Sequence, residues 1–69
     1  MSMATDETAY NGILERIAAQ EARVDRQERL IVHMAAKGLP TGKAEDLLDL
    51  MRIALNTLRA SLSHFEGSN

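Results

Sequence analysis

The chain has 69 residues, a net charge of −2 and a pI near 5.5, which allows one small domain and offers no bulk attraction to phosphate backbones. It contains no cysteine, so a disulfide scaffold, a thiolate zinc site and a cysteine nucleophile are excluded. The sequence shows neither an export signal nor an apolar run long enough to span a bilayer. We therefore expect one domain over residues 1–69, located in the cytoplasm, with no membrane partner.

A first helix is predicted over about residues 5–37, with Thr5 as its N-cap. Apolar residues recur in it at helical spacing and define the two positions of a heptad seam. The first position holds Tyr10, Ile17, Val24 and Ile31, and the second holds Ile13, Gln20, Gln27 and Met34. The two glutamines make the middle of this seam polar, between two apolar ends.

The residues between the helices, about 38–42, form the main break in the pattern. Gly38 suits the left-handed position just past a helix end, Pro40 cannot continue a helix, and Thr41 can cap the next one. The segment is faintly similar to a phosphate-binding loop. However, it has three residues rather than four between its glycines, and Ala44 stands where that loop needs a hydroxyl. A turn between two helices is the better interpretation.

A second helix is predicted over about residues 43–65. Its seam residues alternate by four and three, as in a coiled coil. They are Ala44, Leu48, Met51, Leu55, Leu58, Leu62 and Phe65. Leu47, Leu50 and Ala54 widen this seam to one side, so the apolar arc reaches about 160° at 100° per residue. One neighbouring helix covers a narrower stripe, so part of the arc is expected to meet another chain.

Two helices joined by a tight loop predict an all-α fold, a coiled-coil-like antiparallel hairpin. Because a lone hairpin buries little surface, we expect two copies to form a four-helix bundle. The predicted self-association or partner interface consists of Leu47, Leu48, Met51, Leu55, Leu58, Leu62, Phe65, Ile17, Val24 and Ile31. The expected partner is a second copy, most simply in a homodimer, or else another protein.

Gln20 and Gln27 are the polar residues of the first seam. Polar seam residues cost stability but fix register and oligomeric state, so we predict register-setting hydrogen bonds to Asn56 or Thr57. The alternative is a small all-α enzyme with its site at this polar waist. The first helix is superficially similar to that of all-α chorismate mutases, whose site needs a third helix that is not predicted here. We expect a non-enzymatic interaction or regulatory module, without catalytic, cofactor-binding or metal-binding residues.

Arg23, Arg26 and Arg29 recur every three residues and form a basic ridge. Such a ridge could follow a phosphate backbone, so nucleic-acid binding is the alternative function. Acidic residues interleave with the ridge, and Asp25 lies four residues before Arg29, at ion-pair spacing. A solvated, ion-paired helix face is therefore predicted, and a nucleic-acid partner is not expected.

The two histidines, His33 and His64, are predicted to lie far apart. In an antiparallel hairpin that turns near Pro40, their separation is on the order of 25 Å at ~1.5 Å per residue. They cannot share a metal ion within one chain at that distance. Exposed surface histidines are the simplest interpretation.

A longer pattern covers about two-thirds of the chain, from Arg16 to Leu62. It is carried by Ile17, Glu21, Val24, Arg26, Gln27, Leu30, Ile31, Gly38, Thr41, Ala44, Glu45, Leu47, Leu48, Leu55 and Leu58. In this pattern the chain resembles the short helical-hairpin proteins common in α-proteobacteria. Members often have His at the position of Arg16 and Asp at the position of Pro40, so the match is incomplete. The resemblance implies a hairpin fold and a bacterial cytoplasmic setting, and no established activity.

Overall fold

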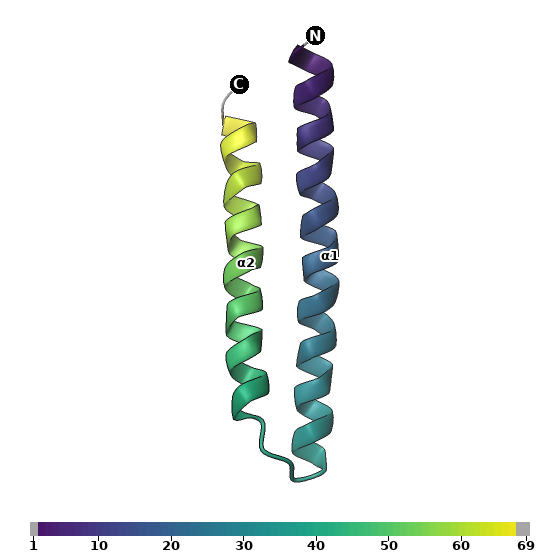
Figure 1. Cartoon of the computed structure of the whole chain (residues 1–69), viewed down its shortest axis with the longest axis vertical. Coiled ribbons are helices and arrows are strands. Elements are labelled where there is room, and N and C mark those ends of the chain that lie inside the picture. The colour runs from purple at the N-terminus through teal and green to yellow at the C-terminus, as the bar shows by residue number, and fades with distance from the viewer. Residues whose placement is uncertain (1, 68–69) are drawn as a thin grey trace.

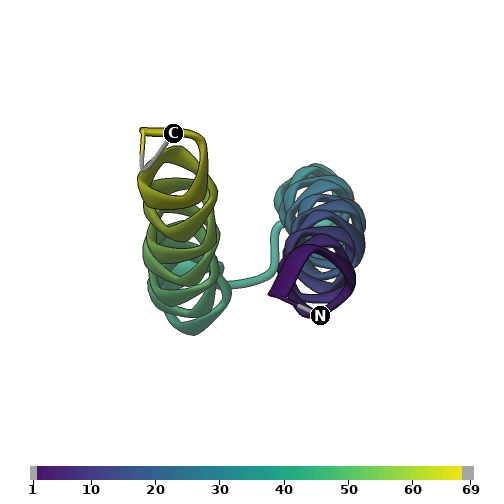
Figure 2. The ribbon, with the colours of Figure 1, turned by 90° about the horizontal axis from the view of Figure 1, so that it is seen from above.

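Two long helices pack side by side and run in opposite directions (Figure 1). The computed structural model describes the backbone of residues 2–67 and the side chains of residues 7–66. Helix α1 comprises Ser2–Ala36, helix α2 comprises Gly42–Gly67, and the described residues contain no strand. Seen from above, the helices form two separate columns in a single layer (Figure 2). The predicted all-α hairpin is thereby confirmed.

The hairpin is long and thin, measuring 55 × 15 × 12 Å. Over the described residues, neither helix has an apolar stretch long enough to cross a lipid bilayer. The helix bounds differ slightly from the sequence prediction, because α1 begins at Ser2 rather than Thr5 and α2 extends to Gly67. Thr5 therefore lies inside α1 and not at its N-cap position, because the helix begins three residues earlier. The side chain of Thr5 lies outside those that the structure describes.

The end of α1 is a Schellman motif built on Gly38, whose φ of 74° is left-handed as predicted. The backbone N–H of Leu39 donates to the carbonyl of Met34 at 2.9 Å, and that of Gly38 donates to the carbonyl of Ala35 at 3.0 Å. These two bonds satisfy carbonyl groups that the end of the helix would otherwise leave without partners. The chain can therefore reverse direction immediately after α1.

Thr41 marks the start of α2. Its carbonyl accepts the first helical hydrogen bond, from the backbone N–H of Glu45 at 2.8 Å. Its hydroxyl donates to the Glu45 carboxylate at 2.7 Å, instead of accepting from a free backbone N–H. The capping position is as predicted, and the side chain is tied to the acidic residue of the first turn.

The core is a single seam, because each helix can bury only one stripe against the other. Leu48 and Leu55 are 7% and 6% exposed, and among the described side chains only Gln27, at 9%, is comparably buried. The other seam residues are half-buried. A seam this thin fixes the orientation of the helices and leaves both sides of the hairpin open to solvent.

Candidate interaction surface

Most of the predicted interface lies inside the hairpin. Nine of its ten residues are buried or half-buried along the seam between α1 and α2. They are Ile17, Val24, Ile31, Leu48, Met51, Leu55, Leu58, Leu62 and Phe65. Only Leu47 is exposed, at 48%. The seam of α2 is therefore occupied by the chain's own first helix, and a second copy has to bind elsewhere while the hairpin stays closed.

The two seam glutamines bind the main chain of the opposite helix. The amide of Gln20 donates to the carbonyl of Met51, and that of Gln27 donates to the carbonyl of Ala44, both at 2.9 Å. The predicted partners, Asn56 and Thr57, were wrong because neither side chain faces the seam. Asn56 is exposed, and the Thr57 hydroxyl bonds to the carbonyl of residue 53 on its own helix. Both amides are engaged in holding α1 against α2.

Two ion pairs join the helices along one side of the seam. Arg59 binds Glu21 at 2.9 Å, and Arg52 binds Glu28 at 2.7 Å. All four residues directly follow a seam residue in the sequence. Successive residues turn by about 100° around a helix, so residues that follow a seam residue share this side. Residues that precede a seam residue lie on the opposite side, so each residue next to a seam residue in the sequence can be assigned to one of two flanks.

The acidic flank consists of the residues that follow a seam residue. It carries six carboxylates and two guanidinium groups, a net charge of −4. Its charged residues are Glu21, Asp25, Glu28, Glu45, Asp49, Glu66, Arg52 and Arg59. Both arginines of this flank pair with carboxylates of α1, so its positive charges are satisfied within the hairpin. Leu14 and Val32, 39% and 69% exposed, are its large apolar side chains.

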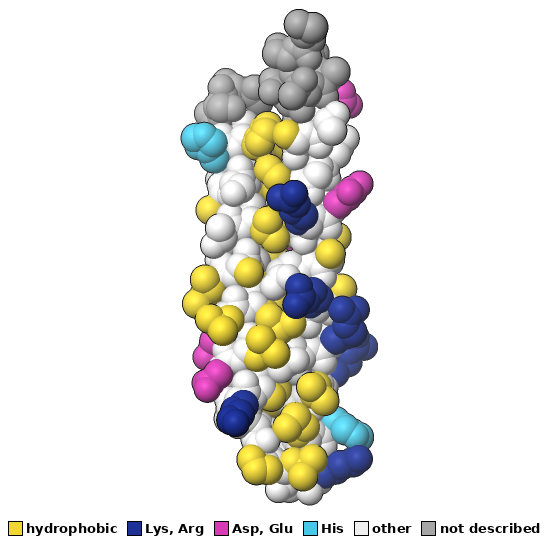
Figure 3. All heavy atoms as spheres, viewed as in Figure 1, with side chains coloured by type: hydrophobic (Ala, Val, Ile, Leu, Met, Phe, Trp, Pro, Cys, Tyr) yellow, Lys and Arg dark blue, Asp and Glu magenta, His cyan; other side chains and the backbone are white. Residues whose placement is uncertain are grey.

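The basic flank consists of the residues that precede a seam residue. It carries four cations, a net charge of +4, and no acidic residue among its positions between residues 9 and 64, all of them described. The cations are Arg16, Arg23, Arg26 and Lys43. Figure 3 shows a face of the hairpin on which most basic side chains lie over α1 and hydrophobic side chains gather over α2.

Exposed leucines occupy the half of the basic flank nearer the loop. Leu50 is 64% exposed, Leu47 48% and Leu30 46%. Leu30 and Leu50 were not in the predicted interface, although each directly precedes a seam residue, as Leu47 does. That shared position was the sequence signal that could have placed all three leucines on one exposed flank. Another exposed apolar residue, Ile53 at 60%, lies opposite the seam and outside both flanks.

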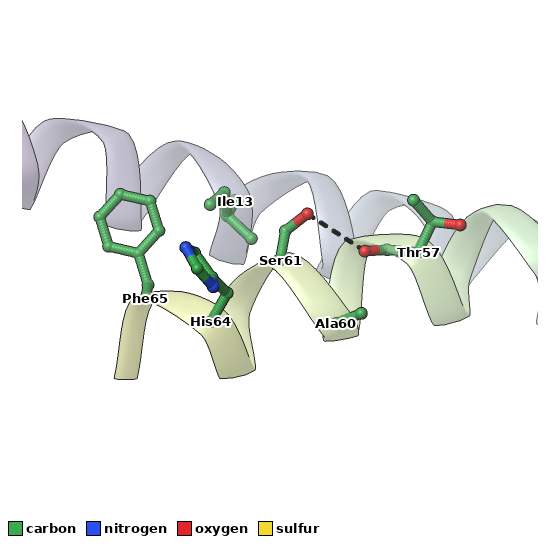
Figure 4. Close-up of a pocket in the computed structure, with 6 residues that line it drawn as sticks. All are labelled: Ile13, Thr57, Ala60, Ser61, His64 and Phe65. Carbon is green, nitrogen blue, oxygen red and sulfur yellow. Dashed lines mark hydrogen bonds between the residues drawn. The ribbon is translucent and has the colours of Figure 1, made fainter. Parts of the chain in front are cut away.

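A shallow groove of about 510 Å³ occupies the other half of the basic flank (Figure 4). Its lining residues are Ile13, Thr57, Ala60, Ser61, His64 and Phe65. The Ser61 hydroxyl donates to the carbonyl of Thr57 at 3.2 Å, and the Thr57 hydroxyl is similarly bonded within α2. Because both hydroxyls are turned back onto the helix, the groove offers mainly apolar surface to a partner.

The predicted neutralisation of the arginine ridge is only partly correct. Asp25 and Arg29 form the expected ion pair at 2.9 Å. Glu21 and Glu28, however, reach across to α2. Arg23 and Arg26 consequently make no ion pair with any described side chain. The basic flank keeps its positive charge at the surface.

No group of three or more potential metal ligands occurs within the described residues. His33 lies in the last turn of α1, next to the loop, whereas His64 lies in the last turn of α2, at the opposite end of the hairpin. The histidines are therefore widely separated, as predicted. The segment that resembled a phosphate-binding loop joins two helices, without a strand before it among the described residues.

The end of the seam far from the loop is aromatic. Tyr10 and Phe65 meet edge to face, with ring centroids 6.3 Å apart. The Tyr10 hydroxyl donates to the Glu66 carboxylate at 3.3 Å. Desolvation, the negative charge of Glu66 and this hydrogen bond together raise the pKa of Tyr10 above its ordinary value. This contact ties the ends of the two helices together.

Comparison with protein-family models, with curated proteins and with solved structures finds no match to this chain. Its function is therefore inferred from the chemistry of its two flanks.

Proposed function

We propose that the protein is a non-enzymatic interaction module that associates with itself through the basic flank, so that two hairpins place four helices side by side. The observation that carries this proposal is the set of exposed leucines beside the groove, Leu30, Leu47 and Leu50. The proposal includes the bacterial cytoplasmic setting that the resemblance to α-proteobacterial hairpin proteins implies.

The shape of the surface supports a helix as the partner. The exposed residues of α2 on this flank, Leu47, Leu50, Ala54, Thr57 and Ser61, follow each other at spacings of three and four. This is the spacing of a second coiled-coil stripe beside the one already occupied by α1. The side chains become small towards the groove, which allows the backbone of another helix to approach closely.

Sedimentation of the wild-type chain and of a Leu47→Glu/Leu50→Glu variant tests the proposal. We expect the wild type to exceed the chain mass of 7.6 kDa at micromolar concentration, and the variant to sediment as a monomer. The matched control is Ile53→Glu, which places a carboxylate at a similarly exposed position outside both flanks. A monomeric wild type, or equal loss of mass in the control, would contradict the proposal.

Nucleic-acid binding is the second candidate, favoured by the guanidinium groups of Arg23 and Arg26, which make no ion pair with a described side chain. It ranks second because a phosphate backbone offers nothing apolar to cover Leu47 and Leu50. We expect no complex with DNA or RNA tighter than about micromolar at physiological salt. A tighter complex that weakens steeply with added salt, and with Arg23→Ala, would reverse this ranking.

A further inference from the structure

The two flanks carry opposite and equal net charge, +4 on the basic flank and −4 on the acidic flank, although the whole chain carries only −2. Each flank runs along both helices on one side of the seam. Each also exposes large apolar side chains, Leu30, Leu47 and Leu50 on the basic flank and Leu14 and Val32 on the acidic flank. The hairpin therefore carries opposite net charges on its two flanks. Each flank is complementary in charge to the other flank and not to a second copy of itself.

This polarity bears on how two copies can meet. If the basic flanks of two copies faced each other, four cations from each would approach without a carboxylate between them. Like charges placed opposite each other suppress an association, whereas opposite charges guide it and fix its register. The basic flank therefore fits the acidic flank of a second copy better than it fits a second basic flank.

Positions along the hairpin agree with this pairing. Arg23 and Arg26 lie in α1 where the acidic flank of another copy presents Asp25, which is paired with Arg29 of its own helix and is 63% exposed. Asp49 adds a carboxylate from α2 that makes no ion pair with a described side chain. Stacking copies in the same orientation would therefore bring Arg23 and Arg26, which pair with no described side chain, beside carboxylates of the next copy.

We propose that the basic flank of one copy docks on the acidic flank of the next, so that the chains assemble head to tail. This inference rests on the proposed self-association and names its two mating surfaces. In a head-to-tail contact each terminal copy keeps one free flank, so growth continues beyond the dimer unless the assembly closes into a ring. The exposed leucines of one copy are covered by the flank that carries Leu14 and Val32 of its neighbour.

Charge-reversed variants that each block one flank test the proposal. Arg23→Glu/Arg26→Glu cancels the charge of the basic flank, and Asp25→Arg/Asp49→Arg cancels that of the acidic flank. All four residues are exposed, so both variants should keep the hairpin. Each variant alone should assemble only at a protein concentration at least tenfold higher than the wild type requires. In each contact between two copies of the same variant, a neutralised flank would face a flank that is still charged. A 1:1 mixture should form a dimer of about 15 kDa, twice the chain mass, through the one intact pair of flanks.

The matched control is Glu15→Arg/Asp46→Arg, which changes the charge equally at positions outside both flanks and should assemble as the wild type does. Strengthened association of Arg23→Glu/Arg26→Glu alone would show basic flanks facing each other and overturn the proposal. So would a mixture that stays monomeric, or that forms dimers no better than the separate variants. Circular dichroism of every sample separates loss of assembly from loss of folding.

The wild type supplies an independent measurement. Its mass should grow beyond the dimer with concentration and fall as NaCl rises from about 0.05 to about 0.5 M, because salt screens attraction between opposite charges. A plateau at twice the chain mass, or assembly that strengthens steadily with salt, would contradict head-to-tail docking. A wild type that stays monomeric under all these conditions would instead refute the self-association on which the inference rests.

Discussion

The acidic and basic flanks are built from the same two helices at the same heptad spacing, yet their charges are satisfied differently. On the acidic flank, Arg52 and Arg59 bind carboxylates of α1 at 2.7 and 2.9 Å. On the basic flank, Arg23 and Arg26 have no such partner among the described side chains, and exposed leucines lie across from them on α2. The acidic flank links the two helices of the hairpin to each other, whereas the basic flank leaves its cations and leucines exposed.

The difference between the two flanks affects the relative position of the helices more than the stability of the hairpin. The side chains of the two inter-helix ion pairs are 46–54% exposed, and exposed ion pairs typically contribute less than about 1 kcal/mol each. Most of the stabilisation comes from the apolar seam that both flanks border. The pairs on the acidic flank instead fix which residues of α2 stand beside which residues of α1, and so determine what the basic flank presents.

The largest expected effect comes from breaking the seam, which would remove both flanks together. Leu55 is 6% exposed, so Leu55→Glu would bury a carboxylate without a partner, at a cost of about 3–5 kcal/mol. We expect circular dichroism to show loss of most helix. Ile53→Glu, at a position that is 60% exposed, is the control and should keep its helix content. Equal helix content in both variants would show that the flanks do not depend on this seam.

A smaller effect is expected at the polar seam residues that align the flanks. Gln27 is 9% exposed and its amide binds the Ala44 carbonyl, so Gln27→Ala should lower the free energy of unfolding by about 1–3 kcal/mol. Gln20 makes the equivalent bond to Met51 but is only half-buried, so Gln20→Ala should cost less. Urea denaturation measures both, and a larger loss at position 20 would contradict the burial argument.

Helical periodicity was sufficient to predict the fold. The 3–4 spacing identified the seam of each helix, and the glycine and proline near residue 38 located the turn. Given the seam, each neighbouring residue belongs to a flank according to whether it precedes or follows a seam residue. The flanks were therefore implicit in the sequence, but the predicted interface included seam residues because one neighbouring helix was expected to cover only part of the apolar arc of α2.

The ion pairs between the two helices could not be read from the sequence. Asp25 and Arg29 lie one turn apart, and this local pair was predicted correctly. Glu21 and Glu28 also have arginines nearby in the sequence, but they bind Arg59 and Arg52, 38 and 24 residues away. A long charged side chain binds a partner on its own helix or on the other helix, depending on the distance between the packed helices. Helical periodicity does not give that distance. Because Glu21 and Glu28 bind α2, Arg23 and Arg26 are left without an ion pair to any side chain that the structure describes.

The contrast between the flanks predicts a still smaller difference in stability. Arg52→Ala removes the ion pair with Glu28 and should destabilise the hairpin by less than about 1 kcal/mol, with the effect shrinking as salt is added. Arg23→Ala removes no ion pair with a described side chain and should leave the unfolding midpoint unchanged. Measurements at low protein concentration separate this effect from self-association. A larger loss for Arg23→Ala would mean that the basic flank also holds the hairpin together.

The smallest expected effect lies where the acidic flank meets the aromatic end of the seam. Desolvation, followed by the charge and hydrogen bond of Glu66, raises the pKa of Tyr10, so the folded chain favours the neutral phenol. The resulting stabilisation is present below about pH 10 and is lost as pH rises through the folded pKa. In an absorbance titration, Glu66→Gln should lower this pKa without fully restoring the ordinary value, because the desolvation remains. Glu15→Gln, outside both flanks, should leave it unchanged. An unaltered titration in Glu66→Gln would mean that the two helix ends are not in contact in solution.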